Sequence, residues 1–231
     1  MSPEFAPWLG AFETLRVLEG VPLFLPEHEA ELRRAAAALG LGRFTMPGKS
    51  GLTKQSGRWR WLLTSGGLQT FFTEEAAPTD APIKLTLSAI RVGSQNWDAR
   101  FKTVSYLSHV QAARGAGEGT EAVLLNEHGE VASAARANIF WRRDNWLFTP
   151  SHEAGCRRGV VRNFIFACEK VESGRFPAHE LLQADEIFLS NSMRGIVSVG
   201  QIDKRALSDF SAAEKLRAAY AAEVQRQLAA G

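Results

Sequence analysis

Cysteine is scarce in this sequence. Only Cys156 and Cys168 occur among its 231 residues, and they do not form a CxxC pair. That number and spacing exclude a disulfide framework and give no support to a thiolate zinc site. The five histidines are scattered along the chain and show no metal-ligand spacing, so we expect no bound metal.

Long apolar runs and an excess of one charge are also missing. No run approaches the roughly 18 apolar residues that span a bilayer, and the first ten residues lack the blocks of a signal peptide. Lysine and arginine number 27 against 25 acidic residues, a formal net charge of +2. A balance this close does not indicate a polyanionic partner. We therefore expect a cytoplasmic protein that binds a small molecule, with neither a nucleic acid nor a membrane as partner.

What the sequence does contain is typical of a globular protein, with 45% hydrophobic and 23% charged residues. The first half is predicted to be a sheet with one helix. Residues 12–25 predict two strands that meet at Glu19-Gly20. Residues 26–41 are rich in Ala, Leu, Glu and Arg and stop at Gly40, which predicts a helix. Further strands are predicted at residues 59–63, 68–72 and 83–91.

The polar residues 94–100 break both periodicities and are predicted to link two domains. A small N-terminal domain would then comprise residues 1–93 and a larger C-terminal domain residues 101–231. In the second half we predict helices near 103–114, 160–171 and 210–228, and strands at 121–126, 137–142, 145–148, 186–190 and 196–199.

Several local motifs fail on inspection. Gly48-Lys49-Ser50 would end a phosphate-binding P-loop, but Arg43 stands where that motif requires glycine. The glycines at 115, 117 and 119 follow a predicted helix instead of a strand and lack the GxGxxG spacing. Cys156 has no activating base near it in sequence, so a loop or semi-buried thiol is favoured over a nucleophile.

Specificity comes from a series of segments in a fixed order. They are Gly10-Ala-Phe-Glu-Thr-Leu-Arg16, Arg100-Phe-Lys102-Thr-Val-Ser-Tyr-Leu, Glu121 to Val131 running into Ala137-Asn138-Ile-Phe140 and Leu147-Phe-Thr-Pro150, Gly155-Cys-Arg-Arg-Gly159-Val-Val-Arg162, and Phe188-Leu-Ser-Asn-Ser192-Met. Together they resemble the fold-type IV enzymes that depend on pyridoxal 5′-phosphate (PLP). That class contains branched-chain and D-amino-acid aminotransferases and 4-amino-4-deoxychorismate lyases. The resemblance implies an α+β, two-domain fold with a small N-terminal α/β sandwich and a larger C-terminal α/β barrel-like domain that binds the cofactor.

The resemblance also implies roles for particular residues. Lys102 would hold PLP as a Schiff base and then move the proton at the substrate carbon, whereas the alternative is an ordinary solvated lysine. Thr14 would lie near the substrate. The remaining cofactor-binding residues that we expect are Tyr106, Ser133, Asn138, Val160, Val161, Asn191 and Ser192. Among these, Val160 and Val161 open a predicted helix, whose first N–H groups suit a phosphate, and Ser192 matches the family's second phosphate-binding turn.

Two positions depart from the family. Ser133 stands where a glutamate normally faces the pyridine nitrogen, and a hydroxyl supplies one hydrogen bond without charge. Glu31 stands where an arginine normally holds the phosphate, and Arg34, one helical turn on, is the candidate replacement. Only Met1 to Leu9 precede Gly10, so the first sheet is expected to lack one strand.

These observations favour one function over two alternatives. Expulsion of pyruvate while an aromatic ring forms depends less on a charged pyridine nitrogen than transamination does, so Ser133 favours a lyase that releases pyruvate and 4-aminobenzoate. The alternatives are a class IV aminotransferase acting on branched-chain or D-amino acids, and a silent relative that has lost PLP. We expect a small amino substrate and a homodimer, because sites of this class are completed by loops of a partner subunit.

Overall fold

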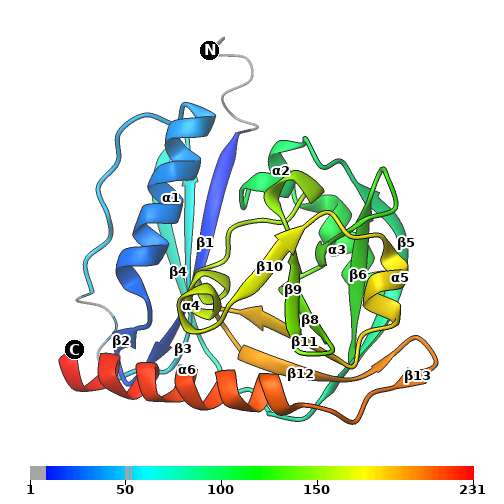
Figure 1. Cartoon of the computed structure of the whole chain (residues 1–231). Helices are drawn as coiled ribbons and strands as arrows, with labels where there is room; N and C mark the ends of the chain where they lie inside the picture. The colour runs from blue at the N-terminus through cyan, green and yellow to red at the C-terminus, as the bar shows by residue number, and fades with distance from the viewer. Residues whose placement is uncertain (1–8, 50–51, 53) are drawn as a thin grey trace. The chain divides into compact units, whose positions relative to one another are not determined.

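The computed structural model describes residues 9–49, 52 and 54–231. The chain divides into two compact units, each built on its own sheet (Figure 1). The first unit contains the described residues as far as Pro78, together with Phe101–Ser105 and Ala221–Gly231. The second unit contains Thr79–Arg100 and Tyr106–Tyr220. These units differ from the predicted ranges of 1–93 and 101–231, since the chain passes between them more than once.

The first unit is a four-stranded sheet with the order β2-β1-β3-β4, in which all neighbours are antiparallel. Its strands are β1 (Gly10–Leu18), β2 (Val21–Pro22), β3 (Gly57–Thr64) and β4 (Gly67–Glu74), and its helix is α1 (Leu25–Leu39). Alternate residues of β1, including Ala11, Leu15 and Val17, are buried with Leu32 of α1 in one apolar cluster. The predicted hairpin and helix are therefore confirmed.

A short segment from the middle of the chain completes this unit. Residues 101–105 run beside the start of β1, where Phe12 N donates to Lys102 O at 2.8 Å and Val104 N donates to Gly10 O at 3.0 Å. Thr103 forms an antiparallel bridge with Ala11. The helix predicted near 103–114 consequently begins later, as α3 (Leu107–Ala116). Backbone hydrogen bonds thus fix the position of Lys102 against the first strand.

The second unit is a nine-stranded sheet with the order β10-β9-β8-β11-β12-β5-β6-β7, to which β13 adds beside β12. Its strands are β5 (Ile83–Val92), β6 (Thr120–Asn126), β7 (Val131–Ala134), β8 (Asn138–Arg143), β9 (Trp146–Pro150), β10 (Val171–Gly174), β11 (Glu186–Asn191), β12 (Gly195–Ile202) and β13 (Arg205–Ala206). Its helices are α2 (Trp97–Arg100), α3, α4 (Val160–Cys168) and α5 (Ala178–Leu182), and α6 (Ser211–Ala230) begins there.

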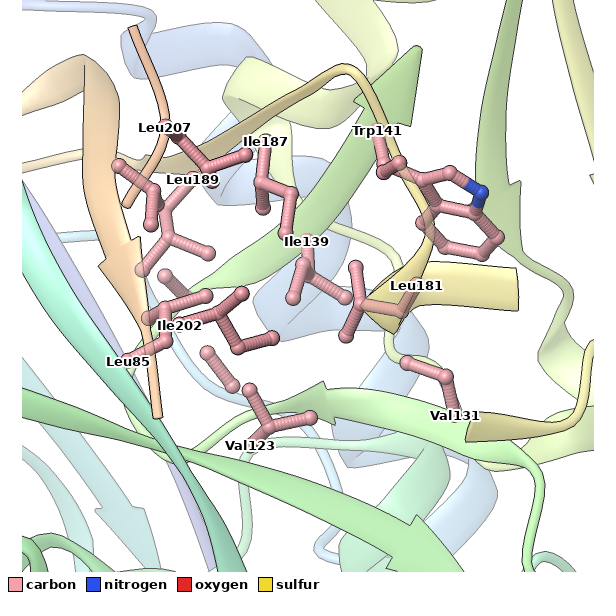
Figure 2. Close-up of a cluster of buried hydrophobic side chains, with 14 of the residues drawn as sticks. Leu85, Val123, Val131, Ile139, Trp141, Leu181, Ile187, Leu189, Ile202 and Leu207 are labelled. Carbon is pink, nitrogen blue, oxygen red and sulfur yellow. The ribbon is translucent and has the colours of Figure 1, made fainter. Parts of the chain in front are cut away.

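One apolar cluster fills the inner side of this sheet. Figure 2 shows Leu85 of β5, Val123 of β6, Ile139 of β8 and Ile202 of β12 directed toward a common centre. Trp141 is 1% exposed at the edge of the same cluster. Because six strands contribute to one core, the sheet curves around it, and the predicted barrel-like second domain is confirmed.

Besides the later start of α3 and the short elements α2, α5 and β13, which were not predicted, three strands differ from the sequence prediction. The strand at 83–91 was placed in the first half, but β5 lies in the second sheet, parallel to both β12 and β6. Strand β7 was not predicted, because Val-Ala-Ser-Ala is short and has no clear alternation. Strand β10 includes Val171, which was assigned to the end of a helix, whereas α4 ends at Cys168.

The described residues contain neither a membrane-spanning helix nor a cluster of metal-ligand side chains. None of the described helices is long and apolar enough to cross a membrane. Within the same part of the chain, no three or more His, Cys, Asp and Glu side chains are grouped so that they could hold a metal ion.

Candidate active site

Lys102 lies in a three-residue polar cluster of the first unit. Its Nζ is 3.1 Å from Glu13 Oε2, and His28 Nδ1 is 2.8 Å from the same oxygen. Glu13 belongs to the buried face of β1, and His28 belongs to the first turn of α1. The Lys102 side chain is 26% exposed, against 8% for Glu13 and 1% for His28. A partly accessible amine is therefore held over a buried carboxylate, and the two are fixed by different elements.

The charge of this carboxylate follows from its neighbours. Burial alone would raise the pKa of Glu13, but the Lys102 ammonium and the His28 ring outweigh that effect and lower the pKa to about 2. Glu13 is therefore ionised at neutral pH and forms an ion pair with Lys102.

Acid should weaken the fold through Glu13. Since its folded pKa of about 2 lies below the ordinary 4.5, its contribution is present above pH 4.5 and is lost as the pH falls toward 2. The difference corresponds to about 3 kcal/mol in the free energy of unfolding. We expect Glu13→Gln to lower the melting temperature at pH 7 and to flatten its decline between pH 4.5 and 3. Thermal unfolding across that range measures this, with Glu19→Gln in the exposed turn after β1 as control; equal slopes for all three proteins would contradict it.

Thr14 is not part of the Lys102 cluster. It follows Glu13 in β1, so its side chain points to the opposite face of the strand. It is half-buried and lies across from Arg60 of β3. The Phe-Glu-Thr motif thus contributes its glutamate to the lysine, a contact that the sequence analysis did not foresee. The glutamate was visible in the motif, but its contact with Lys102 could be recognised only from the path of residues 101–105 beside β1.

The start of α4, in the second unit, carries the predicted residues Val160 and Val161. Gly159 precedes the helix in extended conformation, and Val160 and Val161 are buried at 5% and 1% exposure. The first N–H groups of a helix have no intrahelical acceptor and lie at the positive end of its dipole. A Cβ on Gly159 would lie 2.0 Å from Asn138 Oδ1, so a larger residue there would displace the Asn138 amide.

Asn138 holds the loop that leads into this helix. Its Nδ2 donates to Arg157 O at 2.9 Å and to Cys156 Sγ at 3.3 Å. Burial raises the pKa of the Cys156 thiol, which keeps it protonated at neutral pH, in line with a structural cysteine. Asn138 therefore positions the backbone before α4.

Ser133 lies inside the second sheet. It sits in β7 opposite Leu124, is 3% exposed, and its Oγ has no hydrogen-bond partner among the described residues. A buried hydroxyl without a partner costs free energy, which makes this oxygen a candidate for contact with a ligand.

Asn191 and Ser192 form the turn that follows β11. Asn191 Oδ1 accepts from the backbone N–H groups of Met193 and Arg194 at 3.1 and 2.8 Å, and its Nδ2 donates to Arg136 O at 3.3 Å. This local bonding is an Asx turn, and it leaves Ser192 half-buried in the bend. The structure therefore brings both predicted residues into one turn.

Tyr106 connects several groups just before α3. Its hydroxyl donates to Ala135 O at 2.8 Å and accepts from Arg157 Nη2 at 2.6 Å. The His109 ring stacks on the tyrosine ring with centroids 4.3 Å apart. Burial, aided by the charge of Arg157, lowers the pKa of His109 to about 3, so His109 is neutral at pH 7.

A second acid-sensitive window should come from His109. The unfolded chain binds a proton near pH 6.5 and the folded chain only near pH 3, so stability falls as the pH drops below 6.5, by up to about 1.4 kcal/mol per pH unit. We expect His109→Phe, which keeps the ring stack and cannot be protonated, to reduce the loss between pH 6.5 and 5. Unfolding midpoints measured over that range test this. The exposed His179→Phe is the control, and a decline equal to that of the unmodified protein would contradict the assignment.

Glu31 and Arg34 bind each other. Arg34 Nε donates to Glu31 Oε2 at 3.0 Å, and the guanidinium lies 4.6 Å from the centre of the Phe101 ring. Arg34 was the candidate replacement for the family's phosphate-binding arginine. Its positive charge is balanced by Glu31. Both residues belong to the first unit, beside the segment that carries Lys102.

Comparison with known proteins gives this arrangement a context. The sequence profile of the amino-transferase class IV family matches residues 10–202. An aminodeoxychorismate lyase of Bacillus subtilis (strain 168) is 29% identical over 230 residues, which cover 85% of this chain and 78% of the relative.

Solved structures share the fold. A Thermotoga maritima protein assigned as a branched-chain amino acid aminotransferase superposes with a TM-score of 0.84 at 22% identity, over 97% of this chain and 91% of that one. An aminotransferase from Brucella abortus bound to the cofactor PLP gives 0.77 at 19% identity, over 91% and 87%. The resemblance noted in the sequence and the predicted fold class are thereby confirmed. Since the family profile covers most of the chain, the protein belongs to the amino-transferase class IV family.

Proposed function

We propose that this protein is a PLP-dependent lyase that releases pyruvate and 4-aminobenzoate from 4-amino-4-deoxychorismate. The observation that carries the proposal is Ser133, a buried hydroxyl that has no hydrogen-bond partner among the residues the structure describes, at the position where the family's glutamate would stand. The likeness to the Bacillus subtilis lyase over most of both chains supports the same choice.

The residues present fit the cofactor that membership of this family implies. Lys102 offers a partly exposed amine, the start of α4 offers N–H donors, and Ser133 offers an unpartnered buried oxygen. When bound, PLP withdraws electrons from the substrate carbon next to the amine. Both family membership and the PLP-bound relative of the same fold support this cofactor, as the sequence predicts.

Lys102 is proposed to bind the cofactor covalently and to move the proton at the substrate carbon. Its Nζ must lose a proton to attach and must carry one to deliver it. Glu13, ionised and 3.1 Å away, holds the amine in place. His28 fixes the carboxylate from the other side, at 2.8 Å. Glu13 and His28 are therefore positioning residues, and Thr14 remains the proposed neighbour of the substrate.

The remaining predicted residues are proposed to contact other parts of the cofactor. Val160 and Val161 would bind its phosphate through their backbone N–H groups, and the turn at Asn191 and Ser192 would add a hydroxyl and an amide. Ser133 would meet the pyridine nitrogen with one hydrogen bond and no charge. Tyr106 would contact the pyridine ring of the cofactor. Asn138 would contribute indirectly, by positioning the loop before α4.

The lyase proposal has a direct test. The purified protein with PLP is supplied with 4-amino-4-deoxychorismate, and pyruvate and 4-aminobenzoate are measured separately. We expect the two products in equal amounts. The proposal fails if neither appears while the same sample transfers an amino group from branched-chain or D-amino acids to 2-oxoglutarate.

An aminotransferase is the second candidate, and the likeness to the Thermotoga maritima protein favours it. A carboxylate at the pyridine nitrogen is the feature that transamination needs most, and Ser133 does not supply it. The two reactions are separated by their products, because only transamination consumes a keto acid.

A homodimer remains part of the proposal. Sites of the class that this chain resembles are completed by a second subunit. Light scattering at the concentrations used for activity assays should therefore give the molar mass of a dimer. A concentration-independent monomer with full activity would exclude this assembly.

A further inference from the structure

The side chain of Arg157 carries a positive charge that no described acidic residue balances. It lies two residues before Gly159 and is half-buried. Its Nη2 donates to the Tyr106 hydroxyl at 2.6 Å, and its guanidinium lies 4.8 Å from the centre of the same ring. The other terminal nitrogen, Nη1, is buried and has no hydrogen-bond partner in the described part of the chain. An N–H group left in this state costs free energy that a ligand could recover.

The position of this guanidinium is fixed from two sides. The Tyr106 hydroxyl donates to Ala135 O, so its lone pairs face the arginine. Asn138 holds the Arg157 carbonyl at 2.9 Å. A planar guanidinium with Nη2 hydrogen-bonded and Nη1 without a described partner is suited to bind a planar or tetrahedral oxyanion.

The surroundings of Arg157 add positive charge. Arg158 is the next residue and is exposed, and Arg162, in the first turn of α4, is 5% exposed and donates to Pro150 O and Ser173 Oγ. His109, stacked on the same tyrosine, is neutral. A half-buried cation with further arginines nearby and no acidic partner among the described residues is suited to bind an anion.

We propose that Arg157 binds an oxyanion of the ligand through Nη1, either the phosphate of the cofactor or a carboxylate of the substrate. The naming of these two anions rests on the proposed function, whereas the need for an anion comes from Arg157 itself. This residue is a binding residue that the sequence analysis missed, since Gly-Cys-Arg-Arg-Gly was considered only for its glycines and cysteine.

The test compares Arg157→Gln and Arg157→Lys with Arg158→Gln, which removes the same charge one residue away from an exposed side chain. Dissociation constants for PLP and for pyridoxal, which lacks the phosphate, are measured by absorbance titration, and KM is measured for the substrate. Loss of a charge-assisted hydrogen bond should weaken binding about 10- to 100-fold. The dissociation constant of Arg157→Lys should lie between those of the unmodified protein and Arg157→Gln, because an ammonium group keeps the charge but lacks the two-armed geometry of a guanidinium.

The two sources of the anion give different patterns. If Arg157 binds the phosphate, Arg157→Gln weakens PLP and leaves pyridoxal unchanged. If it binds a carboxylate, both cofactor forms bind as before and KM rises. Unchanged constants in Arg157→Gln, or equal losses in Arg158→Gln, would overturn the proposal.

A separate readout keeps this inference apart from the proposed function. Thermal stabilisation by inorganic phosphate and by 4-aminobenzoate is measured on the unmodified protein and on Arg157→Gln without added cofactor. If the unmodified protein does not bind PLP at all, the proposed function fails. The Arg157 proposal still stands if either anion stabilises the unmodified protein and not the variant, and it falls if neither anion distinguishes the two.

Discussion

Replacement of Lys102 by alanine is expected to abolish covalent cofactor binding and to reduce turnover more than any other single change. Lys102 is the amine held at 3.1 Å from the ionised Glu13, and backbone hydrogen bonds on both sides fix its segment beside β1. Loss of a general acid–base group alone costs about 10²- to 10⁴-fold. After borohydride treatment, mass spectrometry should find the cofactor on the peptide that contains Lys102 in the unmodified protein, and on no peptide of the variant.

Lys49→Ala is the matched control, since Lys49 is an exposed lysine of the same unit. It should retain the visible absorbance and the reducible adduct. A reducible adduct in Lys102→Ala would reject the assignment of the lysine. Failure of both the unmodified protein and the control to take up PLP would instead indicate a silent relative.

Conversion of Ser133 to glutamate is expected to shift the balance of activities toward transamination. The variant places a carboxylate at a position that is 3% exposed, where an unpaired charge is costly. If the pyridine nitrogen lies there, the pair raises the pKa of that nitrogen and strengthens electron withdrawal. Half-transamination should speed up by about tenfold or more, the value of a charged hydrogen bond, while the lyase step should respond less because aromatisation drives it.

Ser133→Gln separates charge from size, because glutamine has the shape of glutamate without its charge. Without PLP, the Ser133→Glu protein should melt at a lower temperature than Ser133→Gln, and PLP should stabilise the glutamate variant more. Identical rates, spectra and PLP-dependent melting shifts for the two variants would remove Ser133 from the cofactor.

Much of the fold could be predicted because its signals are local. The β1–β2 hairpin has a Glu-Gly turn, and α1 has a proline in its first turn and is followed by Gly40, which has a φ of 66°. The alternation of β3 and the apolar runs of β6 and β11 were equally readable. Strand β5 was recognised as a strand and assigned to the wrong sheet, since its two parallel neighbours lie about 35 and 115 residues later in the chain. Periodicity reports that a strand exists and says nothing of its partners.

The candidate site divides in the same way. Lys102, Val160, Val161 and Ser192 lie in motifs with a characteristic local order, and they were accessible to the sequence analysis. The contact of Glu13 with Lys102 joins residues 89 apart, and that of Arg157 with Tyr106 joins residues 51 apart. Such pairs carry no local spacing, so one sequence could not reveal them.

The composition of the first unit also sets the order in which the molecule can be assembled during synthesis. Gln227 Oε1 accepts a hydrogen bond from Phe24 N across 203 residues, and residues 101–105 pair with the start of β1. The first strands leave the ribosome early but cannot complete their packing until residues 221–231 have emerged. The nascent sheet must therefore wait for these contacts while the whole second unit is made. Long-range closure of this kind slows folding and exposes the incomplete chain to aggregation. Deletion of residues 221–231 should therefore reduce the yield of folded protein more than their few side-chain contacts would suggest.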